Sequence, residues 1–123
     1  MASPNIVAIG TVSGFTTVKT DVSTSEVVFL NQSTTDSSVM KVNNIIVANT
    51  TSSSANITIA FRTASGGGGT KVLLANATPV AAYSTLVVLD KASAIYLEEN
   101  KSLTAESSAS NAFDVVASYE KIL

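Results

Sequence analysis

The sequence predicts an all-β protein, an antiparallel β-sandwich of eight or nine short strands. Three observations support this fold class. Ser and Thr make up about a quarter of the chain and alternate with Val, Ile and Ala. Clusters of Ser, Thr, Asn and Gly interrupt the apolar runs about every 10–14 residues. No window shows a clear helical period of apolar residues. The strand order, jelly-roll-like or immunoglobulin-like, stays open.

The first part of the chain alternates strands with polar turns. The expected segments are strands at 5–9, 15–19, 26–30 and 39–49, a polar loop at 31–38 and a turn at 50–54. Gly10 and Gly14 indicate a bend or bulge between the first two strands. The centre of the longest strand, Ile45-Ile46-Val47, is apolar on both faces, which predicts core on one side and a neighbour on the other.

Four consecutive glycines, Gly66–Gly69, are the clearest break in the chain. The segment before them alternates, so that Ile57, Ile59 and Phe61 are expected to face the core. Glycine accepts positive φ freely, and the run therefore predicts an exposed hairpin loop that joins strands 56–63 and 70–75. A phosphate-binding loop would need a following helix and a Lys-Ser/Thr signature, and a strand pattern follows instead.

The last part of the chain continues the same pattern. The expected segments are a crossover loop at 76–83, strands at 84–89, 95–97, 101–107 and 113–120, and turns at 98–100 and 107–111. Pro79 favours a loop at 76–83. Alternation places Leu103 and Ala105 inward, and it places Phe113, Val115, Ala117 and Tyr119 on one face of the last strand.

The composition argues against an enzyme and against catalytic, cofactor or metal sites. The chain has no His and no Cys, which removes the commonest acid–base group and the best thiol nucleophile. Lys101 and Ser102 are adjacent on a strand and would point to opposite faces, so they do not form a nucleophile–base pair. No pair of carboxylates is marked for glycoside hydrolysis. Glu98-Glu99-Asn100 lacks the spacing of a calcium loop, and we interpret it as a solvated turn.

Charge and terminal sequence exclude other classes. The seven Lys and Arg residues are spread singly and the net charge is −2, so no nucleic acid partner is expected. No apolar run approaches the ~20 residues of a membrane span. The first residues resemble no secretion signal, and we expect a soluble protein made in a cytoplasm.

The low charge also suggests where the protein makes contacts. Charged residues are 13% of the chain, about half the usual share of ~25%, which leaves a surface suited to burial against other proteins. Strand edges with so few charges are poorly guarded, and assembly would cover them. We expect one domain, 1–123, with an N-terminal docking arm at 1–5 and a C-terminal docking tail at 121–123. The candidate interface residues are Ala2, Ser3, Pro4, Asn5, Ile122 and Leu123.

Several of these parts occur together in a known class of proteins. Six segments follow one another along the chain. They are the start Met1-Ala2-Ser3-Pro4, the strand 42–50 ending in Asn49-Thr50, the alternating strand 56–62, the glycine hairpin 66–69, and the segments 97–107 and 113–122. In this arrangement the chain resembles the small β-sandwich virion proteins of tailed bacteriophages, particularly of marine myoviruses. The resemblance implies a virion component on the capsid surface or at the neck and tail, with no catalytic residues to carry over.

The sequence therefore predicts a decoration or cement protein that stabilises a phage capsid through protein–protein contacts as a symmetric homo-oligomer. Its partners would be copies of itself and phage capsid or neck and tail proteins, and its location the virion. A neck, tail or fibre component of the same particle is the nearest alternative. A carbohydrate-binding module for host attachment is an alternative of another class, for which Tyr83, Tyr96 and Tyr119 could supply a stacking platform.

Overall fold

The computed structural model describes residues 10–35 and 37–123, and in them the chain forms two antiparallel β-sheets. This arrangement confirms the predicted all-β sandwich. The strands are β1 (Val12–Val22), β2 (Val27–Gln32), β3 (Val39–Asn49), β4 (Ala55–Ala64), β5 (Gly68–Val80), β6 (Thr85–Leu89), β7 (Ile95–Leu97), β8 (Lys101–Ser107) and β9 (Phe113–Ile122). Two single-turn 3₁₀ helices, η1 (Ser65–Gly67) and η2 (Lys91–Ser93), complete the described elements.

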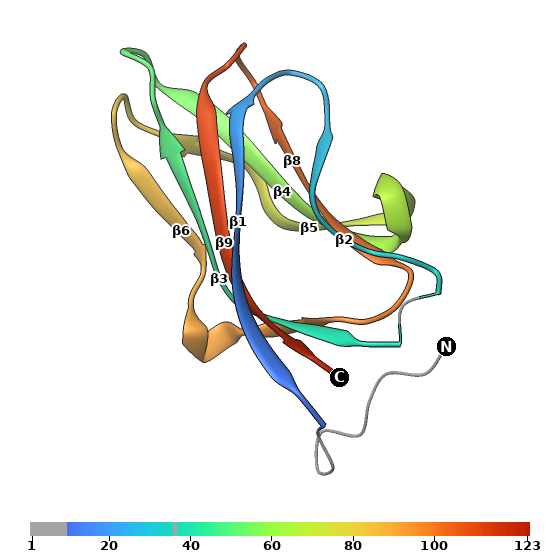
Figure 1. The fold of residues 1–123 in the computed structure, drawn as a ribbon. Coiled ribbons are helices and arrows are strands. Elements are labelled where there is room, and N and C mark those ends of the chain that lie inside the picture. Colours follow the sequence, from blue (N-terminus) through green and yellow to red (C-terminus); the bar gives the residue numbers. More distant parts are fainter. Residues whose placement is uncertain (1–9, 36) are drawn as a thin grey trace.

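The strand order is that of a jelly roll. One sheet, here called sheet A, has the order β1-β9-β3-β6, with β7 also paired to β3, and the other, sheet B, has the order β2-β8-β4-β5 (Figure 1). The pairs β4–β5, β3–β6, β2–β8 and β1–β9 are nested around the β4–β5 hairpin. Such a nested antiparallel ribbon, folded over into two sheets, makes the jelly roll, and this resolves the strand order that the sequence leaves open.

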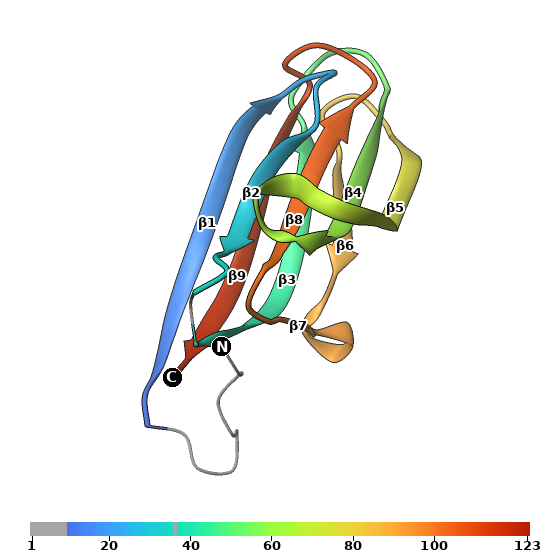
Figure 2. The ribbon, with the colours of Figure 1, turned by 90° about the vertical axis from the view of Figure 1, so that its right-hand side faces the viewer.

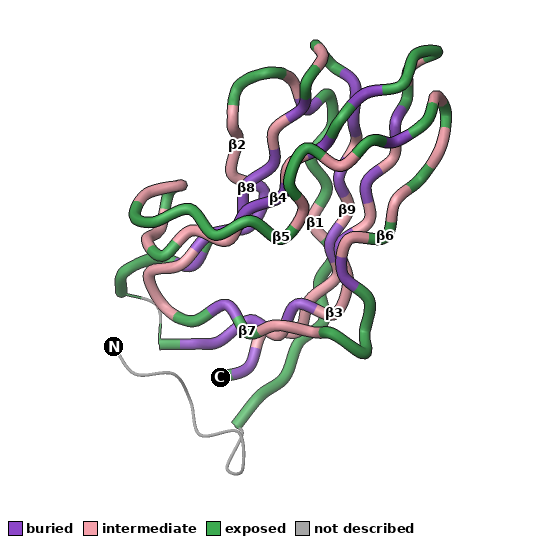
Figure 3. The backbone as a smooth tube through the Cα atoms, turned by 180° about the vertical axis from the view of Figure 1, so that it is seen from behind, coloured by how far each residue is buried: buried purple, intermediate pink, exposed green. Residues whose placement is uncertain are grey.

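The core lies between the two sheets and is aliphatic. The predicted inward residues Ile57 and Ile59 of β4 and Leu103 of β8 are fully buried, and Phe113 of β9 fills the same layer. Each such side chain contributes about 1.5–3 kcal/mol through burial. Buried segments concentrate on the central strands, whereas β1 and β5 are largely exposed (Figure 3). Phe61 is only partly buried at the margin of this core.

Some predicted boundaries were wrong. The expected crossover loop at 76–83 is largely strand, because β5 continues to Val80. Strand β5 lies at an edge of sheet B, where the missing N–H of Pro79 breaks no ladder. Gly14 makes no bulge, since it pairs regularly with Glu120, and the irregularity of β1 falls between Lys19 and Val22.

Other boundaries moved by a few residues. The loop expected at 31–38 loses its first two residues to β2, and β9 extends to Ile122. The strand expected at 5–9 lies outside the described residues. Nothing in the described part of the chain forms a helix long and apolar enough to cross a membrane.

Candidate functional site

Residues 65–69, here called the glycine turn, are held against the outer face of sheet B and do not form a free loop. The turn folds back across β2 and β8 (Figure 2). Backbone N–H groups of residues 65–67 donate to Asn100 Oδ1, Asn31 Oδ1 and Ser102 Oγ at 3.1, 2.7 and 3.0 Å. These donors are the groups that a phosphate would need. The chain's own side chains use them, so the turn serves to cover sheet B.

A charged cluster lies on the same face. The Arg62 guanidinium donates to both carboxylate oxygens of Glu26, with 3.0 Å between Nε and Oε2, and the Thr104 hydroxyl donates to Oε2. Lys71 Nζ lies 4.0 Å from Glu26 Oε1 and 3.5 Å from Glu106 Oε1. The Arg62 hydrogen bond, with Thr104 and Lys71, outweighs desolvation and lowers the pKa of Glu26 to about 2. Glu26 is therefore ionised at neutral pH and serves as a structural acceptor rather than an acid catalyst.

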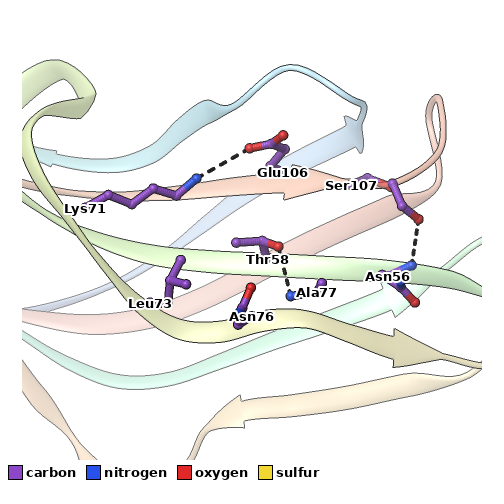
Figure 4. A pocket seen from close by; sticks show the side chains of 9 residues that line it. Asn56, Thr58, Lys71, Leu73, Asn76, Ala77, Glu106 and Ser107 are labelled. Carbon is purple, nitrogen blue, oxygen red and sulfur yellow. Dashed lines mark hydrogen bonds and ion pairs between the residues drawn. The ribbon is translucent and has the colours of Figure 1, made fainter.

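A groove with mostly polar residues around it opens beside this cluster on sheet B (Figure 4). Its volume is about 430 Å³, and its walls come from β4, β5 and the end of β8. An irregularity in β5 forms one wall, where Ala77 adopts a φ of 47° and donates its N–H to Thr58 Oγ1 at 3.0 Å. The lining residues are Asn56, Thr58, Lys71, Leu73, Asn76, Ala77, Glu106, Ser107 and Ser108. Amides, hydroxyls and one ion pair suit hydrogen bonding to a small polar ligand.

The candidate chemical residues considered from the sequence do not form a reactive group. Ser102 is buried and donates its hydroxyl to the Ala64 carbonyl at 2.8 Å, so it helps to hold the glycine turn. Glu99 and Asn100 lie in the turn between β7 and β8, where Asn100 takes a φ of 56°. In the ranges that the structure describes, no three Asp or Glu residues gather to hold a metal ion.

The outer face of sheet A is different, because aliphatic side chains cross it. Val18 pairs with Val116, Val116 with Ile46, and Ile46 with Val87, so that one residue from each of β1, β9, β3 and β6 lies in line. We call these four residues the outer aliphatic row. Val18 and Val87 are 59% and 56% exposed, and the two central residues are half-buried. Outward-facing aliphatic residues on four neighbouring strands form a surface suited to contact with another protein.

Sequence reasoning missed this row. A signal was present in Val116, which is apolar at a position expected to face outward between Asp114 and Ser118. Ile46 was expected to be buried on its outer side, but it is half-buried there. The alignment of the row depends on the register of strands that are far apart in the sequence.

The exposed aromatic residues are dispersed. Phe15 of β1 is 47% exposed and stacks on Tyr119 of β9, with 5.5 Å between ring centroids. Tyr83 lies in the turn between β5 and β6, and Tyr96 lies on β7. Tyr96 and Tyr119 pair with Lys41 and Val42, consecutive residues of β3, and therefore point to opposite faces of sheet A. Tyr83 lies beyond the other end of β3, where its N–H donates to the Thr51 carbonyl, so the three tyrosines do not form a shared stacking platform.

The sequence-predicted interface residues are placed as follows. Ala2, Ser3, Pro4 and Asn5 lie outside the described residues. Ile122 is 5% exposed and pairs with Val12 and Val39, so it contributes to this chain's own fold. Leu123 bonds through its backbone to Thr11 but leaves 54% of its surface exposed, and it stays a candidate contact.

Comparison with protein-family models and with curated proteins gives no match for this chain.

Proposed function

We propose that this chain is a structural protein of a tailed bacteriophage particle, which decorates the capsid and stabilises the shell by protein–protein contacts. The observation that carries the proposal is the outer aliphatic row, which crosses sheet A from Val18 to Val87. Monomeric proteins rarely expose large contiguous apolar surfaces without a partner. Copies bound to the assembled shell and not to its dissociated subunits would stabilise the shell by mass action.

The contrast between the two sheets supports this assignment. Sheet B covers its outer face over β2 and β8 with the glycine turn and the ion pairs of Glu26, and its exposed aliphatic residues, Val72, Leu73 and Leu74, are consecutive on the edge strand β5. Sheet A presents aliphatic residues on four neighbouring strands. An associative role needs no reactive group. It needs a surface that packs against a partner and excludes water from the contact.

The test is co-sedimentation with expanded empty capsids of the phage that encodes the chain. Val87→Lys places a charge in the outer aliphatic row on the far side from β1. We expect capsid binding to weaken by about tenfold or more if the row is buried on the capsid. Val72→Lys is the matched control, since Val72 is 48% exposed on β5 of sheet B. Equal binding by wild type and both variants would refute the role of sheet A, and no capsid binding by wild type would refute decoration.

The neck, tail or fibre of the same particle is the alternative position, and it would use the same surface. Co-sedimentation with purified tails separates the two positions. Binding to tails and not to capsids would move the protein to the tail.

A carbohydrate-binding module is the second candidate function, and the groove on sheet B favours it. The carboxamides of Asn56 and Asn76, the carboxylate of Glu106 and the aliphatic Leu73 could hold the hydroxyls and one face of a sugar. A glycan array followed by titration tests this function. Asn76→Ala should then abolish binding, whereas Thr85→Ala on sheet A should leave it unchanged. Binding to no glycan would remove this candidate.

A further inference from the structure

Within residues 10–35 and 37–123, strand β1 pairs with β9 alone, and its other backbone edge carries a defined pattern of hydrogen-bonding groups. Thr11 and Leu123 exchange backbone hydrogen bonds, at 3.4 Å from Thr11 N to Leu123 O and 2.8 Å from Leu123 N to Thr11 O. The register of β1 with β9 is regular from Val12 to Lys19. Bonded pairs alternate in an antiparallel ladder. The N–H and C=O groups that point away from β9 are therefore those of Val12, Gly14, Thr16 and Val18.

This edge is less protected than the other three sheet edges of the described chain. Strand β6 has only five residues, and its register with β3 is shifted. Strand β2 has six residues and an irregularity between Val28 and Leu30. Strand β5 has three irregularities and contains Pro79. These are devices by which sheets avoid edge-to-edge pairing, and β1 has none of them along its eight regular residues.

We propose that β1 pairs antiparallel with β1 of a second copy, about a two-fold axis that passes at Phe15. This register follows from the backbone pattern. Centring the pair on Phe15 places Val12 opposite Val18 and Gly14 opposite Thr16, so that all four free backbone units find partners. If the axis were moved by one residue in either direction, one of these four residues would lie opposite a residue other than Val12, Gly14, Thr16 or Val18.

The side chains of β1 fit the same register. Phe15 meets its symmetry mate at a non-hydrogen-bonded position, where side chains approach most closely. Each ring already stacks on a Tyr119, so the contact would join four aromatic rings in one line. Lys19 would lie opposite Thr11, which avoids like charges across the axis.

The pairing would also extend the outer aliphatic row. Val12 and Val18 point to the outer face of sheet A and are 47% and 59% exposed. In the dimer, Val12 of one copy continues the row of the other beyond Val18. The inference thus deepens the proposed function, because it names the partner at β1 and doubles the surface offered to a capsid.

A cross-linking experiment tests the register, and the chain suits it because it contains no cysteine. Phe15→Cys places two thiols opposite each other, at a Cα separation compatible with a disulfide. Ser13→Cys lies on the same face and strand, but its symmetry mate would be four residues away, at about 13 Å. We expect mild oxidation to give covalent dimers of Phe15→Cys and not of Ser13→Cys. Equal yields from the two variants would overturn the register.

Sedimentation velocity with a second pair of variants tests the edge itself. Thr16→Pro removes an N–H that points away from β9, so the β1–β9 ladder keeps its bonds. Thr16→Val removes the same hydroxyl and keeps the N–H. We expect wild type and Thr16→Val to be dimers and Thr16→Pro a folded monomer, with folding checked by circular dichroism. A monomeric wild type, or a dimeric Thr16→Pro, would overturn the inference.

These measurements require no capsid, so the two proposals fail separately. A dimer that ignores capsids and tails would support this inference and refute the virion role. A monomer that binds capsids would do the reverse.

Discussion

The ion pair of Glu26 allows the sharpest prediction of stability. Its pKa falls from 4.5 to about 2 in the folded protein, chiefly because of the hydrogen bonds from Arg62. A lowering of this size corresponds to about 3 kcal/mol in favour of the folded state at neutral pH. The Glu26 side chain is 23% exposed, and solvent screening reduces the expected contribution to about 1–2 kcal/mol.

The sign of the pH dependence follows from the lowered pKa. The contribution is fully present above the ordinary value of 4.5, and it is lost as the pH falls through the folded value of about 2. Glu26→Gln keeps the shape of the side chain and removes its titration. The variant should therefore be less stable than wild type by about 1–2 kcal/mol at pH 7, and the difference should shrink between about pH 5 and pH 2.

Urea denaturation at pH 7, 5, 3 and 2 measures this difference without changing the ionic strength. Glu106→Gln is the matched control, because Glu106 lies on the same face, is 38% exposed and contacts only Lys71 among the described ion pairs. It should change the free energy of unfolding by less than about 0.5 kcal/mol. A difference between wild type and Glu26→Gln that stays constant from pH 7 to pH 2 would refute the reasoning.

Three further predictions concern the turn, a buried amide and the core, and urea midpoints check all of them. In Gly69→Ala, the new Cβ would lie 2.5 Å from Thr63 Oγ1 at a φ of 70°, and we expect a loss of about 2–4 kcal/mol. Gly66→Ala, at a φ of 68° with no atom within 4 Å, should cost about 1 kcal/mol, and equal losses would contradict the steric argument. Asn49→Ala removes a 2%-exposed carboxamide that bonds two backbone carbonyls, and it should cost about 2–3 kcal/mol. Phe113→Ala should cost about 3–5 kcal/mol through the cavity it leaves, and a loss below 1 kcal/mol would show that β9 is not central to the core.

Local patterns in the sequence were sufficient for the central strands. Residues 39–49 form β3 within the predicted bounds, and the alternation of Ile57 and Ile59 places both in the core. These segments are predictable because a strand with one buried face must repeat its apolar residues every second position. Peripheral strands carry a weaker signal. Pro79 and the small residues of β5 have the same composition as a loop, and only the position of β5 at a sheet edge makes them compatible with a strand.

The candidate site could not be predicted in this way, because its parts are joined by contacts that are distant in sequence. The glycine turn is fixed by Asn31, Asn100 and Ser102, each 35 residues from the backbone group it bonds. No local rule connects these residues. Likewise, Val18 and Val116 become neighbours only through the β1–β9 register of the jelly roll.

The exposed strand edge and the exposed aliphatic residues of sheet A are adjacent, which favours the proposed interface. Strands β2 and β5, at the edges of sheet B, are interrupted, and its outer face is covered in part by the chain's own turn. The unprotected features of sheet A are adjacent, because Val18 belongs both to the free edge of β1 and to the outer aliphatic row. In the proposed assembly, a paired copy would cover the edge of β1, and the aliphatic rows of the two copies would form one continuous surface for contact with the shell.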